Sequence, residues 1–158
     1  MDDKKRLLKE FEEAFSDLQK EFGFTYTLDQ LDDYFNLRNG IIDKGFVPGY
    51  LYKALCSVVA SNFRDWHSYF NNLLLPNSGY YASQTEAKLF SSEEDKKMLW
   101  KLIKKTMEFS SMSSLVNLKS DKELAKKFLD ESILYWANEF QPKLVEIITK
   151  VNEAWKKE

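Results

Sequence analysis

The chain has 158 residues, of which 44% are hydrophobic and 30% charged, and its formal net charge at pH 7 is −2. This size and composition predict one folded domain over residues 1–158 and exclude a largely disordered chain. The charge argues against a polycation that coats nucleic acid, and the single His and single Cys exclude a metal site built from several such residues. Because no run of about 18 apolar residues occurs, no membrane-spanning segment is expected.

The first predicted helix covers residues 7–22. Its apolar side chains recur every three or four positions, which places them on one face: Leu7, Leu8, Phe11, Ala14, Phe15, Leu18 and Phe22. Gly23 is expected to end this helix in the left-handed conformation, since glycine adopts a positive φ without steric cost.

The second predicted helix begins at a capping box formed by Thr27 and Gln30. An Asn-Gly pair at 39–40 interrupts its pattern, so a weak point or break is predicted there, and Gly45 is expected to end the helix. Pro48 is predicted to occupy the first turn of the third helix, which covers residues 49–75. That helix has an unusually wide apolar face, which is typical of an element with neighbours on more than one side.

An irregular loop is predicted at 76–83, the only stretch rich in turn-forming residues. Ser83 with Glu86 matches a capping box and predicts a short helix after the loop. Ser91 with Glu94 matches another capping box and begins the fourth long helix.

The serine-rich segment 110–114 is expected either to fray or kink the end of the fourth helix or to pack closely on a neighbour, because serine side chains are small and compete for backbone hydrogen bonds. Ser120 with Glu123 predicts the start of the fifth helix, and Pro142 either kinks that helix or begins a sixth. The sequence therefore predicts an all-α fold: a single-domain bundle of five or six mostly antiparallel helices, with a long central third helix.

His67 and Cys56 are the only residues of their kinds, and both fall on the third predicted helix. Eleven residues of helix separate them by about 16 Å along the axis, so they form neither a catalytic pair nor a shared metal site. His67 is predicted to be a structural or surface residue, and no catalytic residue, cofactor site or metal site is predicted.

A basic stripe on the fourth long helix is formed by Lys97, Lys101, Lys104 and Lys105. Residues 93–119 contain six Lys and four acidic residues, a local charge of +2. The stripe is either the solvated face of an amphipathic helix or a candidate phosphate-binding surface. No aromatic residue is expected to interrupt it, which weakens the nucleic-acid interpretation.

The clustered carboxylates are expected to complement helix dipoles, since they fall in predicted first turns: Asp29, Asp32, Asp33, Glu93, Glu94 and Asp95. Tyr80 and Tyr81, in the predicted loop, are the candidate partner-binding residues, because loops and tyrosines are both frequent at interfaces. Alternatively, these two rings hold the loop against the helices.

The leading functional hypothesis is a non-enzymatic interaction protein, a small subunit or adaptor within a larger complex, whose partner is a protein. The alternative is a nucleic-acid-associated helical subunit that uses the lysine stripe, and the third hypothesis is an enzyme without a recognisable motif. A cytoplasmic location is expected, because a lone cysteine forms no intramolecular disulfide and the chain starts without a signal peptide.

Overall fold

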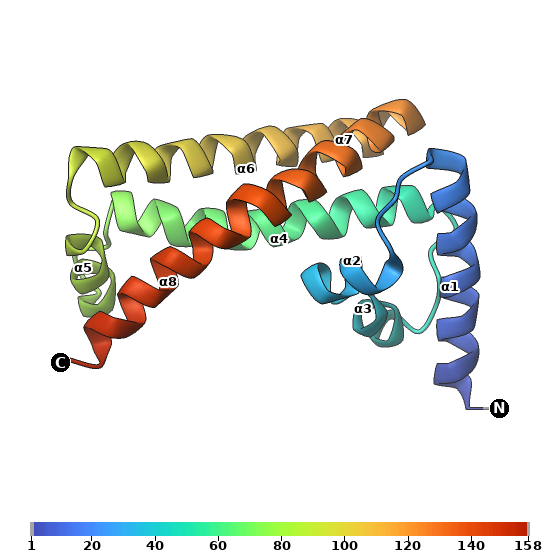
Figure 1. Cartoon of the computed structure of the whole chain (residues 1–158), viewed down its shortest axis with the longest axis horizontal. Helices are drawn as coiled ribbons and strands as arrows, with labels where there is room; N and C mark the ends of the chain where they lie inside the picture. Colours follow the sequence, from blue (N-terminus) through green and yellow to red (C-terminus); the bar gives the residue numbers. More distant parts are fainter. Residues whose placement is uncertain (1, 158) are drawn as a thin grey trace. The chain divides into compact units, whose positions relative to one another are not determined.

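The computed structural model describes residues 2–157, and all regular structure within them is helical. The all-α class predicted from the sequence is therefore confirmed. Within this part of the chain, no helix is both long enough and apolar enough to cross a membrane. The elements are, in chain order (Figure 1), α1 (Asp3–Phe22), α2 (Leu28–Phe35), α3 (Leu37–Lys44), α4 (Leu51–Leu74), α5 (Tyr81–Lys88), α6 (Glu93–Lys119), α7 (Lys122–Tyr135), the π-helical turn η1 (Trp136–Phe140) and α8 (Gln141–Trp155).

The predicted helix count and the long central third helix are wrong. The third helix in the chain is α3, which has only 8 residues, whereas the longest helix is α6, with 27. The segment predicted as the third helix is α4, with 24 residues. One reason for the higher count is that the predicted second helix is divided into α2 and α3.

The division between α2 and α3 lies at Asn36, not at the Asn-Gly pair 39–40, which is inside α3. Asn36 has φ 52°, in the left-handed region that asparagine tolerates better than most residues. Asp32 then stabilises the new helix, because its Oδ1 accepts the backbone N–H of Arg38 at 2.8 Å. The break therefore depends on a carboxylate from the preceding helix, which local helix propensity does not reveal.

Two kinds of helix end follow the sequence prediction. The Thr27–Gln30 capping box forms, with N–H to side-chain oxygen distances of 3.1 and 2.9 Å. Gly23 ends α1 with φ 67°, and Gly45 ends α3 with φ 76°. Left-handed glycines and reciprocal caps are strong local signals because each satisfies backbone groups that a helix end leaves unpaired.

Two predicted caps are displaced by one residue. Ser92, rather than Ser91, accepts the N–H of Asp95 at the start of α6, at 3.1 Å. Asp121, rather than Ser120, accepts an N–H at the start of α7, at 3.0 Å. Each start offers two adjacent capping side chains, and only the backbone geometry selects between them.

The serine-rich segment does not end α6, so of the three predicted alternatives fraying is wrong. The helix continues through residues 110–114 to Lys119. Ser113 is buried, and the Ser111 hydroxyl donates to the Met107 carbonyl at 2.9 Å. Small hydroxyl side chains bonded back to their own helix allow close packing without breaking it.

The two predicted proline positions have different outcomes. Pro48 precedes α4, which starts at Leu51, so its placement in the first turn is wrong. Pro142 lies in the first turn of α8, directly after η1, where Gln141 N–H bonds to the Trp136 carbonyl. Proline lacks an N–H and clashes with the carbonyl four residues earlier, and the wider π-helical turn provides room for it.

The described residues divide into two compact units. Unit 1 comprises residues 2–59 and 113–130, and unit 2 comprises residues 60–112 and 131–157. Helices α4, α6 and α7 contribute residues to both units. The single domain over residues 1–158 stays a prediction.

Unit 1 buries the apolar face of α1, where Phe11, Phe15, Leu18 and Phe22 are all buried. The reversal at Gly23 brings the Phe24 ring back to within 5.7 Å of the Phe15 ring centre. Charged side chains also join the helices of this unit through ion pairs and hydrogen bonds.

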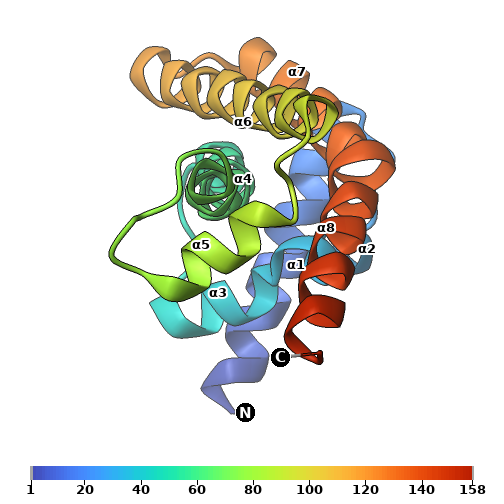
Figure 2. The same ribbon diagram turned by 90° about the vertical axis from the view of Figure 1, so that its left-hand side faces the viewer.

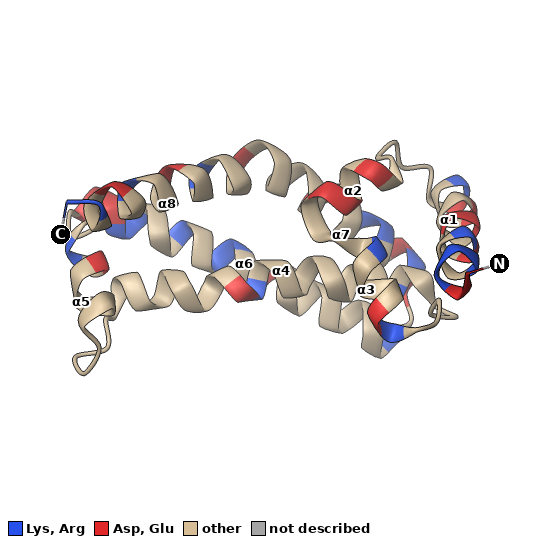
Figure 3. Cartoon of the chain, turned by 90° about the horizontal axis from the view of Figure 1, so that it is seen from below, with Lys and Arg blue, Asp and Glu red and all other residues tan. Residues whose placement is uncertain are grey.

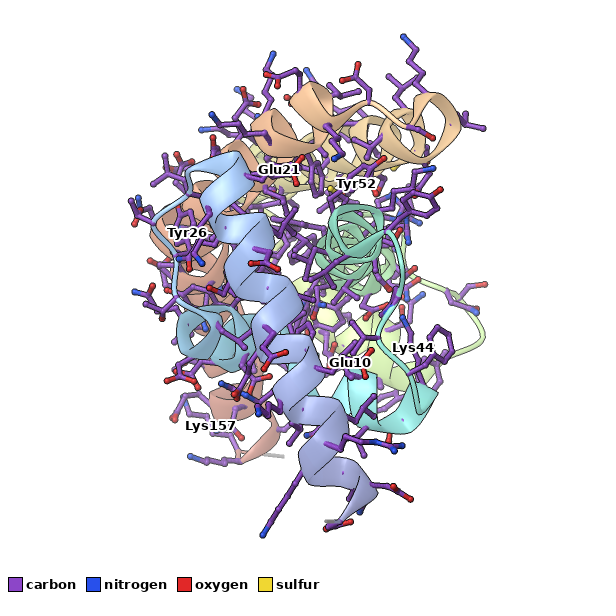
Figure 4. The ribbon with its side chains drawn as sticks, turned by 90° about the vertical axis from the view of Figure 1, so that its right-hand side faces the viewer. Glu10, Glu21, Tyr26, Lys44, Tyr52 and Lys157 are labelled. Carbon is purple, nitrogen blue, oxygen red and sulfur yellow. The ribbon has the colours of Figure 1, made fainter. Side chains whose placement is uncertain are left out.

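Lys122 and Lys53 each join helices of unit 1. The Lys122 ammonium contacts the Glu21 carboxylate at 2.6 Å and lies 5.8 Å from the Tyr52 ring centre. Glu21 lies near the C-terminal end of α1 (Figure 4). The Lys53 ammonium donates to the Ser120 hydroxyl at 2.6 Å and to the Asn117 carbonyl at 3.3 Å, next to the C-terminal end of α6. A cation at this end complements the helix dipole.

The core of unit 2 is an aromatic cluster around Phe63, which is fully buried on α4. Its ring centre lies 4.8 Å from that of Phe140, 5.0 Å from Phe109 and 5.2 Å from Trp136. These aromatic pairs bury large areas and add about 0.5–1.5 kcal/mol each beyond burial. The residues of η1 therefore contribute two of the rings that fill the core.

Helix α5 lies across the ends of α4 and α8 (Figure 2) and is held there by Glu86. The Glu86 carboxylate accepts hydrogen bonds from the Tyr69 hydroxyl and the Trp155 indole N–H, both at 3.0 Å. Burial, with Glu86 nearby, raises the pKa of Tyr69, so its hydroxyl stays a donor.

Candidate functional site

An open groove of about 750 Å³ lies between α6 and the segment formed by α7 and η1, entirely within unit 2. All four lysines predicted as phosphate-binding residues line it, and basic residues recur along α6 (Figure 3). We call this site the α6–α7 groove; its lining residues are Lys97, Trp100, Lys101, Lys104, Lys105, Glu108, Glu131, Leu134, Tyr135, Asn138 and Glu139.

The four lysines of the groove fall into two classes. Among residues 2–157, Lys97, Lys101 and Lys104 make no ion pair or side-chain hydrogen bond, and all three are exposed. Lys105 is half-buried: it pairs with Glu108 at 3.0 Å and lies 4.9 Å from the Phe109 ring centre and 5.7 Å from that of Tyr135. Three cations are thus left available to a ligand, and the fourth is used in packing.

Two large apolar side chains of the groove are exposed. Trp100 is 57% exposed and Leu134 is 54% exposed. The expectation that no aromatic residue interrupts the lysine stripe is wrong, because Trp100 lies between Lys97 and Lys101 in the chain and lines the same groove. Exposed apolar side chains gathered in a concave site are typical of a binding surface.

Tyr135 gives the groove a hydroxyl that stays neutral. Burial, together with the nearby carboxylates of Glu139 and Glu108, raises its pKa to about 12. The facing wall also contains Glu131, so carboxylates and lysines lie on the same groove. This mixture of charges, rather than a uniformly basic surface, is what the structure adds to the sequence pattern.

Tyr80 and Tyr81 are 62% and 68% exposed, and Leu75, which directly precedes the predicted loop in the chain, is also exposed. The predicted loop is shorter than 76–83, because α5 already begins at Tyr81. The Ser83–Glu86 capping box is wrong: Ser83 is buried inside α5, where its hydroxyl accepts the N–H of Asn77 at 3.1 Å. The Tyr81 ring centre lies 6.4 Å from that of Trp155, so one of the two tyrosines does pack on the helices.

The single histidine and cysteine are placed differently. His67 is partly exposed on the part of α4 that belongs to unit 2. Cys56 is fully buried in unit 1, with its Sγ 3.9 Å from the Ala125 carbonyl oxygen. Burial raises the pKa of the Cys56 thiol to about 12, so it is protonated at neutral pH and a poor nucleophile.

Four of the predicted first-turn carboxylates do lie in first turns: Asp29 in α2, and Glu93, Glu94 and Asp95 in α6. Asp29 and Asp32 also bind Arg38. The Arg38 guanidinium lies 2.7 Å from Asp29, 3.1 Å from Asp32 and 3.6 Å from Glu12, joining α1, α2 and α3. The hydrogen bond that the Arg38 guanidinium donates to Asp29 is the largest influence that raises the pKa of Arg38. Among the described residues, no three His, Cys, Asp or Glu side chains are placed to hold a metal ion.

Sequence reasoning found the lysines of the groove but missed its apolar part. Trp100 follows Lys97 by three positions, a spacing that places both on one side of a helix, so a local signal existed. Leu134 and Tyr135 lie about thirty residues away, and no local pattern connects them to α6. No family model matches this chain, and no curated protein or solved structure matches it either.

Proposed function

We propose that this chain is a non-enzymatic interaction protein, a small helical subunit or adaptor, and that the α6–α7 groove is where it binds a partner protein. The observation that carries this proposal is the combination of exposed Trp100 and Leu134 with three lysines that have no ion pair among residues 2–157. Binding hot spots are typically large apolar or aromatic side chains bordered by charged residues. The groove has both features.

The buried thiol of Cys56 is consistent with a protein that does no nucleophilic chemistry there. We also propose a cytoplasmic location, because a single free cysteine suits a reducing compartment. Finally, we propose that the helices form one bundle of mostly antiparallel neighbours, the arrangement that a chain of short-linked helices favours.

A capture experiment tests the proposed function. Tagged protein is incubated with native host lysate, with and without nuclease, and bound proteins are identified by mass spectrometry. We expect one protein to be retained at near-stoichiometric amounts, with and without nuclease, and to be lost with the Trp100→Ala/Leu134→Asp variant. The matched control is Phe46→Ala/Leu118→Asp, which changes exposed apolar residues of unit 1 and should retain the partner.

Two outcomes would count against the proposal. If the groove variant and the control variant retain the same partner equally, the groove is not the binding site. If the captured material is lost on nuclease treatment, the protein-partner hypothesis fails.

A second candidate function is phosphate binding by the lysines, in a nucleic-acid-associated subunit. Trp100 favours it, because an exposed indole among lysines can stack on a base. The carboxylates of Glu131 and Glu139 on the same groove oppose it, since they repel a polyanion. Steep weakening of binding with rising salt would support this second candidate.

Tyr80 and Tyr81, both exposed, remain a proposed second contact surface. The Tyr80→Ser/Tyr81→Ser variant in the same capture experiment should weaken, but not abolish, retention of the partner. Full retention with this variant would remove the tyrosines from the binding surface.

A further inference from the structure

Within the described residues, the two sides of the α6–α7 groove differ in how many charged side chains lack an ion-pair partner. On α6, three lysines lack one: Lys97, Lys101 and Lys104. Lys105 is already neutralised by Glu108, at 3.0 Å. On the facing side, Glu139 at η1 pairs with no lysine or arginine in residues 2–157, and its charge acts on the neutral Tyr135 hydroxyl. A ligand that complements this groove therefore carries mainly negative charge, on the edge that faces α6.

The spacing of the lysines defines the shape of that negative edge. Positions 97, 101 and 104 are separated by four and three residues, which places them in one row along α6. The row is about 10 Å long at 1.5 Å per residue. Carboxylates at the same spacing on a second helix form a parallel or antiparallel row of equal length, so each can meet one lysine.

The apolar part of the groove completes the description of the ligand. Trp100 and Leu134 are both more than half exposed and line the same groove as the lysine row. A helix with an apolar stripe beside its acidic edge covers these side chains, as amphipathic helices do in grooves between two helices. The volume of about 750 Å³ is within the range of occupied binding sites.

We propose that the α6–α7 groove binds an acidic amphipathic helix of a partner protein, with carboxylates at positions i, i+4 and i+7 that pair with Lys97, Lys101 and Lys104, and with an apolar stripe that covers Trp100 and Leu134. This inference rests on the proposed function and specifies the chemistry of the partner. Nucleic acid is the less suitable occupant, because carboxylates line the groove and all of its cations are lysines, which lack the bidentate geometry of arginine.

Synthetic peptides test the proposal with the full chain. The first probe is a helix-stabilised peptide with Glu at i, i+4 and i+7 and Leu at i+3 and i+10. The second is the same peptide with Lys at those three positions, the third has Gln there, and the fourth probe is a single-stranded DNA 20-mer. Binding is followed by NMR through the Trp100 indole N–H signal, assigned by its loss in Trp100→Phe.

We expect the Glu peptide to shift the Trp100 signal and to bind about 10- to 100-fold more tightly than the Gln peptide. The Lys97→Glu/Lys101→Glu/Lys104→Glu variant should lose this preference by the same factor and bind the Lys peptide instead. The matched control is Lys5→Glu/Lys20→Glu/Lys126→Glu, which changes the net charge equally at exposed sites of unit 1 and should bind the Glu peptide as the wild type does.

The outcomes separate the inference from the function on which it rests. Equal binding of the Glu and Gln peptides at Trp100 overturns the acidic edge but leaves the groove as a protein-binding site. If only the DNA shifts the Trp100 signal, both the inference and the proposed function are overturned. Failure of every probe to shift the Trp100 signal overturns the acidic-helix inference, while the capture experiment still decides the proposed function.

Discussion

The two units of this chain use charged side chains in different ways. In unit 1, Arg38, Lys122 and Lys53 are each engaged with groups from other helices, so their charges hold helices together. In unit 2, the core is built from aromatic rings around Phe63, and three lysines of α6 have no ion pair with any described residue. Unit 1 also has exposed lysines without a described ion pair, such as Lys126, but the lysines of unit 2 line a groove together with the exposed Trp100 and Leu134. This combination is why the binding site is proposed in unit 2.

The largest expected effect comes from the aromatic core. Phe63→Ala should lower the free energy of unfolding by about 3–5 kcal/mol, because it leaves a cavity among four aromatic rings. Chemical denaturation followed by tryptophan fluorescence measures it in unit 2, which contains all four tryptophans: Trp66, Trp100, Trp136 and Trp155. Phe46→Ala, at an exposed site, is the control and should cost less than about 1 kcal/mol. A loss for Phe63→Ala as small as that of the control would contradict the aromatic core.

Arg38→Ala should have the next largest effect, about 1–2 kcal/mol. The substitution leaves Asp29, Asp32 and Glu12 close together without their cation. Thermal and chemical unfolding followed by far-ultraviolet circular dichroism measures the loss. Arg6→Ala is the matched control, since Arg6 makes only one exposed ion pair, at 3.5 Å, and should change stability by less than about 0.5 kcal/mol. Equal effects of the two substitutions would contradict the role of Arg38 in joining the helices of unit 1.

Tyr135→Phe should change the stability of the protein only in alkaline solution. The pKa of Tyr135 is raised from 10.0 to about 12, so the folded protein favours the neutral phenol. This contribution to stability is complete below pH 10 and is lost as the pH rises through 12. The variant should therefore lose less stability between pH 9 and pH 11, by about 1 kcal/mol after allowing for partial solvent exposure. Tyr80→Phe, at an exposed site, should follow the wild-type curve, and identical curves for all three proteins would contradict the burial of Tyr135.

The smallest effect is expected for the lysines of the groove. Lys97→Gln/Lys101→Gln/Lys104→Gln should leave the free energy of unfolding within about 0.5 kcal/mol of wild type, because these side chains pair with no described residue. Chemical denaturation of the triple variant beside Arg38→Ala gives the direct comparison. A loss above about 1 kcal/mol would show that the lysines serve packing, and the contrast between the units would fail.

The sequence predicted those features whose signals are local. The apolar face of α1, the Thr27–Gln30 capping box and the glycine ends at Gly23 and Gly45 all depend on residues within one or two turns. The sequence predicts the break at residues 39–40 rather than at Asn36. The difference arises because Asp32 stabilises the next helix by accepting the backbone N–H of Arg38, six residues later. Such a contact depends on the path of the backbone, which no local propensity contains.

The candidate site divides in the same way. The lysine row was visible because its spacing lies within α6, whereas its apolar and acidic surroundings come from α7 and η1. The sequence therefore identified the residues available for binding and missed the groove that they line. Tyr80 and Tyr81 are exposed as a binding surface requires, and their role stays a prediction.

The reactivity of Cys56 can report the local opening of unit 1. Its sulfur is sealed among packed side chains and, because burial raises the pKa of the thiol to about 12, it reacts with a thiol reagent only when the surrounding helices separate. The rate of its alkylation under native conditions therefore reports how often the helices of unit 1 separate. All four tryptophans lie in unit 2 and do not report on this event. Measured together with tryptophan fluorescence from unit 2, the alkylation rate allows the opening of the two units to be compared without an engineered label.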